Sequence, residues 1–444
     1  MLTAFIRAFR TPDLRKKLLF TLGIIALFRF GSSLPAPGIN EANVSFCGNV
    51  ASKSGLASTL QIVDLLSGNA LKYMSVFALG IMPYITASII LQLLTVVIPR
   101  LETLKNEGQS GQAKITQYTR YLTIGLAILQ STAIVALAEN PTQLFGQACS
   151  SSLLVNERVF TIATMVICLT AGTAVIMWMG ELITDRGVGN GMSVMIFTQV
   201  IAVIPGELLA IYQDRGTFTA LLSIIVIMVV VGFVVFMEQA QRRIPVQYAK
   251  RMVGRRMYGG TSTYIPMKVN QAGVIPVIFA SSLLYIPTLA VSLFGSQTNP
   301  QGWVSWVQRY MEIGSTTGLS NIWFYLGLFF VLIVAFTFFY VSITFNPVEV
   351  ADNMKKYGGF IPGIRPGRPT AEYLSYVLNR LTTPGSIYLG VVALFPLVAL
   401  ATIGVADQFP FSGVSLLIMV GVGLDTVKQI ESQLQQRNYE GFLR

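Results

Sequence analysis

The 444-residue sequence has no histidine and little charge. It contains three Cys, and 11% of its residues are charged against 53% hydrophobic. Without His, the commonest general base, proton relay and metal ligand are missing, and Cys47, Cys149 and Cys168 are too scattered for a metal site. Soluble domains carry roughly 25% charged residues. The composition therefore predicts an all-α polytopic membrane protein with no metal and no cofactor.

Enzyme signatures are missing as well. The sequence has no glycine-rich phosphate loop followed by Lys and Ser or Thr, no HExxH motif and no Ser/His/Asp set. Ion-coupled transport needs carboxylates within the bilayer, but Glu181, Glu238 and Asp425 lie at or near the ends of hydrophobic segments. We therefore expect no enzyme. Two further classes stay open as hypotheses. One is a secondary transporter with inverted repeats, which the lack of carboxylates at the span centres disfavours, and the other is a structural membrane scaffold.

Ten segments are hydrophobic enough to span a membrane, for which about 20 apolar residues suffice. Basic residues precede the first segment, but LPAP at 34–37 is a poor cleavage site, so it is interpreted as a span. The last segment should continue as a polar helix into water. The ten spans lie at 18–35, 71–98, 119–138, 159–180, 190–211, 218–237, 271–294, 319–345, 384–403 and 410–434.

The basic residues support this count. With the N-terminus in the cytoplasm, alternation places 25 of the 31 Lys and Arg residues in cytoplasmic segments. Cytoplasmic loops of membrane proteins carry such an excess. The pattern predicts both termini inside and explains the net charge of +11 without nucleic acid. The six exceptions are Arg29, Lys53, Lys72, Arg158, Arg215 and Arg309.

Two predicted cytoplasmic loops, 238–270 and 346–383, are too long for simple connections. In the first, 242–248 and 257–264 have the pattern of hairpin strands; in the second, 358–367 is too rich in Pro and Gly for a helix. Basic loops at a membrane surface bind anionic lipid or a cytoplasmic partner. Lipid is the simpler interpretation of the first loop, whereas a rigid tip presenting Arg365 favours a specific contact.

Two distant stretches nearly repeat each other: GIMPYITAS at 80–88 and GVIPVIFAS at 273–281. Five of nine positions match, which coincidence could also produce, because Gly, Ile and Ala are common in membrane helices. A Gly and a Pro inside an apolar helix are unfavourable unless a bend or close approach is needed. Matching interruptions in two halves indicate an inverted repeat around a central pathway. The repeat pairs Ile85 with Ile278.

A short apolar stretch precedes the second span. Residues 57–68 have a helical pattern but are too few to span, and Ser67, Gly68 and Asn69 break the pattern. The stretch is either a re-entrant half-helix or an ordinary helix at the outer surface, and the sequence does not favour the first over the second.

Several longer motifs resemble the SecY/Sec61-alpha family, which includes the channel subunits of the bacterial Sec protein translocase. The resemblance covers almost the whole chain. The motifs are PAPG at 35–38, ALGIMPYI at 78–85, LQLL at 91–94, QYTRY at 117–121, GELITDRGVGNG at 180–191, KVNQAGVIP at 268–276, FNP at 345–347 and PGIRPG at 362–367.

The resemblance implies two pseudo-symmetric inverted halves around an hourglass pore, with spans 1–5 in residues 1–211 and spans 6–10 in residues 212–444. It also implies a constriction of bulky aliphatic side chains, which blocks ions by dewetting and yields around a passing peptide. By motif position, the members of this pore ring are Ile81, Ile85, Ile196, Ile278 and Ile418.

The resemblance further implies a plug, a lateral gate and docking sites. The plug would be the half-helix near 57–68, with the core residues Ile62, Val63, Asp64, Leu65, Leu66, Ser67 and Gly68. Spans 2 and 3 would face spans 7 and 8 across the gate, which would be lined by Thr86, Gln92, Gln130 and Asn270. The motor or ribosome would dock on Lys250, Arg251, Arg255, Arg256 and Arg365.

The family also implies function and partners. The expected function is a passive channel that moves unfolded secretory proteins across the plasma membrane and releases hydrophobic segments into lipid. The expected partners are the SecE and SecG subunits, the SecA ATPase, the ribosome, preproteins with signal sequences and anionic lipid, with nucleic acid met only through the ribosome. Cys47 and Cys149 should lie outside, where two thiols can pair.

Overall fold

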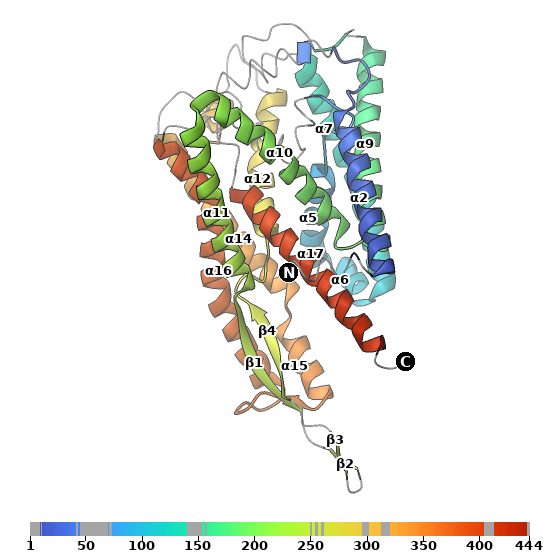
Figure 1. Ribbon diagram of the computed structural model, residues 1–444, viewed down its shortest axis with the longest axis vertical. Helices are drawn as coiled ribbons and strands as arrows, with labels where there is room; N and C mark the ends of the chain where they lie inside the picture. Colours follow the sequence, from blue (N-terminus) through green and yellow to red (C-terminus); the bar gives the residue numbers. More distant parts are fainter. Residues whose placement is uncertain are drawn as a thin grey trace.

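A computed structural model gives an elongated body of long helices with a β-hairpin projecting from one end (Figure 1). The plug residues Ile62 to Gly68, the cysteines Cys47 and Cys149, and Lys250 and Arg255 lie outside the described part. The structure describes residues 9, 11–40, 43–44, 70, 73–139, 153–155, 158–248, 251–253, 256–258, 262–294, 302–311, 320–403 and 413–441.

Ten helices of at least 16 residues occur in the described ranges, and each overlaps one predicted span, which confirms the all-α polytopic fold. Six are long and apolar enough to cross a membrane by length and composition, or seven if the bent pair α5–α6 counts as one. The ten are α2 (Pro12–Ser33), α5 (Met82–Val97), α7 (Gln109–Glu139), α9 (Val159–Arg186), α10 (Gly191–Arg215), α11 (Thr217–Gln239), α12 (Ile275–Phe294), α14 (Ser320–Thr344), α16 (Arg368–Ile403) and α17 (Gly413–Gly441).

Three shorter helices join these spans. After α5, the backbone of Ile98 is extended before Pro99, and α6 (Pro99–Asn106) leaves at 105° to α5. This is the expected effect of a proline on the residue before it. The helix α13 (Gly302–Met311) packs on α12 and α14, and α15 (Pro347–Lys356) packs on α16.

Two predicted boundaries were wrong. The second span begins at Met82 and not at residue 71, because 73–81 form turns. The loop 346–383 is largely helical: α15 fills its start, and α16 begins at Arg368, well before the predicted 384. Asn346 starts α15 by accepting hydrogen bonds on Oδ1 from the N–H of Val348 at 3.1 Å, with proline at the first helical position.

The order of neighbouring helices is the same in both parts of the chain. In the first part, α5 packs on α7, α7 on α9 and α9 on α10. In the second part, α12 packs on α14, α14 on α16 and α16 on α17. The last helix, α17, also packs against α10 and α11, so it joins the two sets.

The repeated segments have the same backbone structure. Gly80 has φ 56° and Gly273 has φ 63°, values that favour glycine, and in each copy a helix begins two residues later. The N–H groups of Tyr84 and Ile85 both donate to the carbonyl of Ile81. At the equivalent positions, the N–H groups of 277 and 278 both donate to the carbonyl of 274.

The prolines of the repeat do not interrupt helices, contrary to the expectation of a break inside each span. Pro83 and Pro276 are the second residues of α5 and α12. A missing N–H is harmless there, since the first four N–H groups of a helix have no partner within it. The repeat therefore marks two matching helix starts.

Four glycines allow close approaches that repeat in the same way. A Cβ on Gly172 of α9 would lie 2.1 Å from the carbonyl oxygen of Val76, and one on Gly385 of α16 would lie 2.5 Å from that of Val269. Val76 and Val269 each lie four residues before the repeated glycine. Gly191 and Gly413, the first residues of α10 and α17, approach the preceding helix in a similar way. A Cβ added to them would lie 1.8 Å from the carbonyl oxygen of residue 180 and 2.1 Å from that of residue 392, respectively.

The projecting part is a small sheet with its own core. The strands β1 (Gln241–Tyr248) and β4 (Ser262–Lys268) are antiparallel, and β5 (Gly359–Phe360) pairs with the other edge of β1. Side chains from one face, including Ile244, Val246 and Met267, pack with α15, α16 and α14. The predicted hairpin is confirmed, but its second strand is 262–268, and 256–258 instead pairs with β2. The tip is β2 (Arg251–Val253) with β3 (Arg256–Tyr258).

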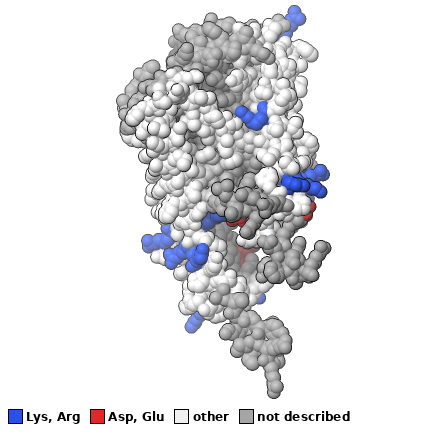
Figure 2. Space-filling model, in the orientation of Figure 1, with Lys and Arg blue, Asp and Glu red and all other residues white. Residues whose placement is uncertain are grey.

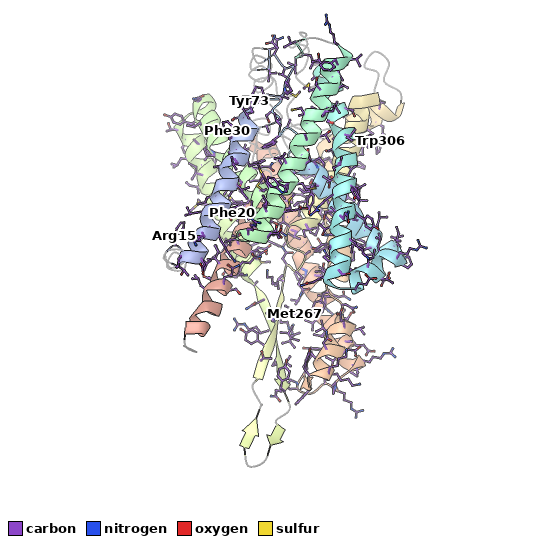
Figure 3. All side chains as sticks on the ribbon, turned by 90° about the vertical axis from the view of Figure 1, so that its right-hand side faces the viewer. Arg15, Phe20, Phe30, Tyr73, Met267 and Trp306 are labelled. Atoms are coloured by element: carbon purple, nitrogen blue, oxygen red, sulfur yellow. The ribbon has the colours of Figure 1, made fainter. Side chains whose placement is uncertain are left out.

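The two ends of the molecule differ in charge. On the face in Figure 2, uncharged surface covers most of the helical body, and most Lys and Arg side chains lie toward the hairpin end. Figure 3 places Met267 at this end and Tyr73 and Trp306 toward the opposite end. There Trp306 packs on Tyr310 and Phe324 with ring centroids 5.3 and 6.2 Å away. Amphipathic aromatic rings are typical of a membrane–water interface.

Candidate functional site

The five predicted ring isoleucines meet in one hydrophobic cluster. Ile81 precedes α5, Ile196 lies on α10, Ile278 on α12 and Ile418 on α17; all four are buried, and Ile85 packs against the same cluster half-buried. The cluster therefore joins helices from both parts of the chain. Its chemistry is purely aliphatic at these positions, so it offers no group that could bind an ion or a peptide hydrogen bond.

The repeated helix starts place these side chains. Ile85 and Ile278 each follow the repeated glycine by five residues. Ile196 and Ile418 each follow the first glycine of their helix, Gly191 or Gly413, by five residues as well. The close backbone approaches of those glycines fix the depth at which each helix begins, and thereby the depth of its isoleucine.

One member of this arrangement was missed from the sequence. Val274 is the equivalent of Ile81 in the repeat, and it packs against the same cluster. Its Cγ2 would lie 2.9 Å from a Cβ on Gly421 of α17. The repeat, applied to this position as it was to Ile85 and Ile278, would have identified it.

Buried polar groups lie one turn beyond two ring members. Gln199 follows Ile196 on α10 and is 0% exposed, and Ser282 follows Ile278 on α12. Neither side chain has a hydrogen-bond partner. Residues three and four apart share a helix face, so each lies on the face of its isoleucine. Neither residue was predicted from the sequence.

Of the helices predicted to face each other across the gate, α12 packs against both α5 and α7. The predicted polar residues, however, do not pair with one another. The hydroxyl of Thr86 donates to the carbonyl of Met82 on its own helix at 3.0 Å. Gln92 is exposed and Gln130 half-buried.

The fourth predicted gate residue, Asn270, has partners that the sequence did not reveal. It is 3% exposed, and its Nδ2 donates to Oε1 of Glu238 at 2.5 Å and to the carbonyl of Gly273 at 3.1 Å. Glu238 is the penultimate residue of α11 and is itself buried. A buried side-chain hydrogen bond thus joins α11 to the turn before α12.

An ion pair joins α7 to α9. Arg120 binds Glu181 through two hydrogen bonds, Nε to Oε1 at 2.7 Å and Nη2 to Oε2 at 2.8 Å. Such bidentate pairs fix orientation as well as distance. The sequence placed Glu181 at a helix end but gave no signal for its partner 61 residues away.

The predicted docking residues lie at the hairpin end as far as the structure describes them. Arg251 is in β2 and Arg256 in β3. Arg365 is exposed on the non-helical turn between β5 and α16, whose glycines Gly363 and Gly367 have φ 84° and 110°. The hydroxyl of Thr370 donates to the Arg365 carbonyl at 2.9 Å and fixes this turn to the start of α16.

A metal centre finds no support in the described ranges, which hold no group of three or more His, Cys, Asp or Glu residues able to bind an ion. Cys168, on α9, is unpaired. The arrangement is therefore an aliphatic junction between two sets of helices, flanked by a helix interface and a charged projecting sheet.

Comparison with known families identifies this arrangement. The family model for SecY matches residues 75–427. The chain belongs to the SecY family. Curated SecY relatives are named protein translocase subunit SecY; the one from Streptomyces coelicolor is 62% identical and that from Mycobacterium tuberculosis 59% identical, and in both cases the alignment covers 100% of each chain.

Solved structures agree with the SecY fold. The chain matches a structure described as a protein-conducting channel with a TM-score of 0.62 and 18% identity, over 94% of this chain and 91% of the other. It matches Sec61 in a canine ribosome–channel complex with a TM-score of 0.58 and 16% identity, over the same shares. SecY and Sec61 channels are ten-helix membrane proteins, and the chain is accordingly a multi-pass membrane protein.

Proposed function

We propose that the chain is a protein-conducting channel that moves unfolded secretory proteins across the plasma membrane and releases hydrophobic segments sideways into lipid. The observation that carries this proposal is the aliphatic cluster at which α5, α10, α12 and α17 meet. It lies between two sets of helices and contains no charged group. Membership in a family named for protein translocation supports it.

The cluster acts as a gasket in this proposal. Branched apolar side chains in a narrow neck exclude water, and a dewetted neck blocks ions. The same side chains have no polar group with which to hold a peptide, so a chain passes without being retained. The side chains part around it and close behind it. No covalent chemistry is required, and the energy comes from the partner.

Sideways release uses the interface of α12 with α5 and α7. These contacts are few compared with those within each set of helices, so the interface can separate while each set stays packed. A hydrophobic segment that enters between the helices exchanges contact with α12 for contact with lipid. Thr86, Gln92, Gln130 and Asn270 would form the polar lining of this gate.

The projecting sheet and the Arg365 turn form the docking surface in this proposal. They lie at the basic end, which the positive-inside rule assigns to the cytoplasm together with both termini. The partners would be the SecA motor and the ribosome there, and the SecE and SecG subunits in the membrane. Arg365→Glu should abolish driven translocation while insertion and folding stay normal; a change confined to lipid dependence would support the lipid interpretation instead.

The decisive experiment is a crosslink from a stalled secretory chain. A photoreactive residue at Ile85 or Ile278 should capture the chain from opposite sides of the neck. The matched control is the same residue at Leu22 of α2, which is 51% exposed on the outer surface of the bundle. Equal capture at all three positions, or none at the isoleucines, would contradict the proposed path.

A further inference from the structure

Three elements meet where the projecting sheet joins the membrane helices. There α11 ends at Gln239, β4 leads through Asn270 into α12, and α16 passes so closely that Gly385 has no room for a side chain beside Val269. Glu238 and Asn270 are buried in this junction and hydrogen-bonded to each other. Their contact links the two chain segments that lead into and out of the sheet.

The sheet is continuous with this junction. The β1–β4 ladder runs in register from Gln247 paired with Ser262 to Gln241 paired with Lys268. One more backbone hydrogen bond extends it, from the N–H of Val269 to the carbonyl of Ala240 at 3.0 Å. Directly beyond it lies the side-chain bond between Glu238 and Asn270, so hydrogen bonds connect the two strands with Asn270 without interruption.

The junction also holds the start of α12. Asn270 donates from the same nitrogen to the carbonyl of Gly273, the glycine with φ 63° that begins the turn into the helix. Its Oδ1 is buried and has no hydrogen-bond partner. The amide is thus held through its donor side alone, and Glu238 is the side chain that holds it.

We infer that Glu238 is a positioning residue for the gate: through Asn270 it makes the projecting sheet and the first turn of α12 move together. The inference rests on the proposed function in so far as α12 is the gate helix. A partner that tilts the sheet then shifts the start of α12, and through it Ile278, one turn farther on. Without the hydrogen bond, the sheet and the helix move separately.

The test separates the hydrogen bond from the charge and from packing. In Glu238→Leu the acceptor is lost. In Asn270→Asp two carboxylates face each other. In Glu238→Gln an amide oxygen still accepts from Asn270, and in the double variant E238Q/N270D the amide of position 238 donates to the carboxylate of position 270. Asp425→Asn is the control, because its exposed pair with Lys268 at 3.4 Å lies beside the junction.

The first readout does not depend on transport. Hydrogen exchange is measured on the full chain in lipid nanodiscs, at the amides of 277 and 278, which bond to the carbonyl of Val274. Removing one partner of a buried hydrogen bond corresponds to about a tenfold change in the opening equilibrium. We expect exchange about tenfold faster in E238L and N270D and near-normal exchange in E238Q and D425N. The double variant should exchange more slowly than N270D but faster than the unmodified chain, because an aspartate at position 270 cannot donate to the carbonyl of Gly273. Unchanged exchange in E238L, or a double variant that exchanges as fast as N270D, overturns the inference.

The second readout addresses the gate. With the complete translocase, a precursor that carries a defective signal sequence is compared with the normal precursor. Loosening α12 in E238L and N270D should raise the translocation rate of the defective precursor relative to that of the normal precursor. The maximal rate with the normal precursor should change little. If exchange accelerates but this ratio stays constant, the inference about Glu238 holds, and the assignment of α12 as the gate helix in the proposed function is wrong.

Discussion

The starts of α5 and α12 share one backbone conformation but have different surroundings. The start of α5 lies within the helix bundle: Phe77 is buried, stacks on Phe28 with ring centroids 5.7 Å apart, and leaves Gly31 no room for a side chain. The start of α12 follows β4 after a short turn, and Asn270 in that turn donates a hydrogen bond to Glu238. The same glycine turn and helix start is therefore packed into the bundle in one half, and in the other half it connects the bundle to the projecting sheet.

The largest expected effect comes from filling the close approaches that both starts share. Gly172→Val and Gly385→Val would each push a side chain into a backbone carbonyl oxygen, at 2.1 and 2.5 Å from the Cβ. Overpacking of this kind costs about 3 kcal/mol. We expect both variants to lose much of their folded yield and thermal stability in detergent, by similar amounts, since the two sites are equivalent.

Gly125 and Gly232 provide the control, because both lie inside helices with no atom within 4 Å of an added Cβ. Alanine there should be neutral or stabilising by about 0.5–1 kcal/mol. If only one of the two valine variants were destabilised, the equivalence of the two helix starts would not extend to their packing.

The next effect concerns the isoleucine cluster. Serine at Ile196 and Ile418 together removes one equivalent side chain from each half, and ion conductance in planar bilayers should rise because a polar neck no longer dewets. Each single variant should leak less than the pair and to a similar extent. Serine at the lipid-facing Leu129 and Val229, which are 66% and 67% exposed, should leave conductance unchanged. A pair that stays sealed would contradict the gasket.

These comparisons also show what the sequence could and could not predict. Hydrophobic length and charge predicted ten spans, and the repeat predicted the pairing of Ile85 with Ile278, because both are properties of nearby residues. The role of the glycines was misjudged: Gly273 and Pro276 were read as a break within a helix, although only the structure shows where a helix begins.

Long-range partners were out of reach for a different reason. Glu238 meets Asn270 across 32 residues and Arg120 meets Glu181 across 61. Each of these side chains looks like an ordinary polar residue at a helix end. Nothing in their local spacing indicates a partner, because the partner is set by helix packing and not by neighbouring residues.

A smaller effect is expected from the ion pair that joins α7 to α9 in the first part of the chain. By the register of Gly172 with Gly385, the position of Glu181 corresponds to Leu394, which packs in the hydrophobic cluster. The Arg120 side chain is 47% exposed, so its pair with Glu181 should contribute about 1 kcal/mol or less. A double-mutant cycle with Arg120→Gln and Glu181→Gln, read by thermal unfolding, measures the coupling. A coupling of several kcal/mol would mean that the pair is far better shielded from water than its exposure indicates.

The smallest effect is expected at the two prolines of the repeat. Pro83 and Pro276 occupy the second position of their helices, where alanine adds an N–H that needs no partner within the helix and removes no existing bond. Pro83→Ala and Pro276→Ala should therefore change the free energy of unfolding by about 1 kcal/mol or less, and equally. Both prolines are buried, so each alanine variant also loses the packing of two ring carbons, and this loss should be similar at the two sites. Prolines that bent their helices would behave differently: their replacement would straighten α5 and α12, change the α5–α12 distance measured between spin labels at Gln92 and Leu283, and alter signal-sequence selection. We expect that distance to stay constant, because these prolines begin the helices and do not bend them.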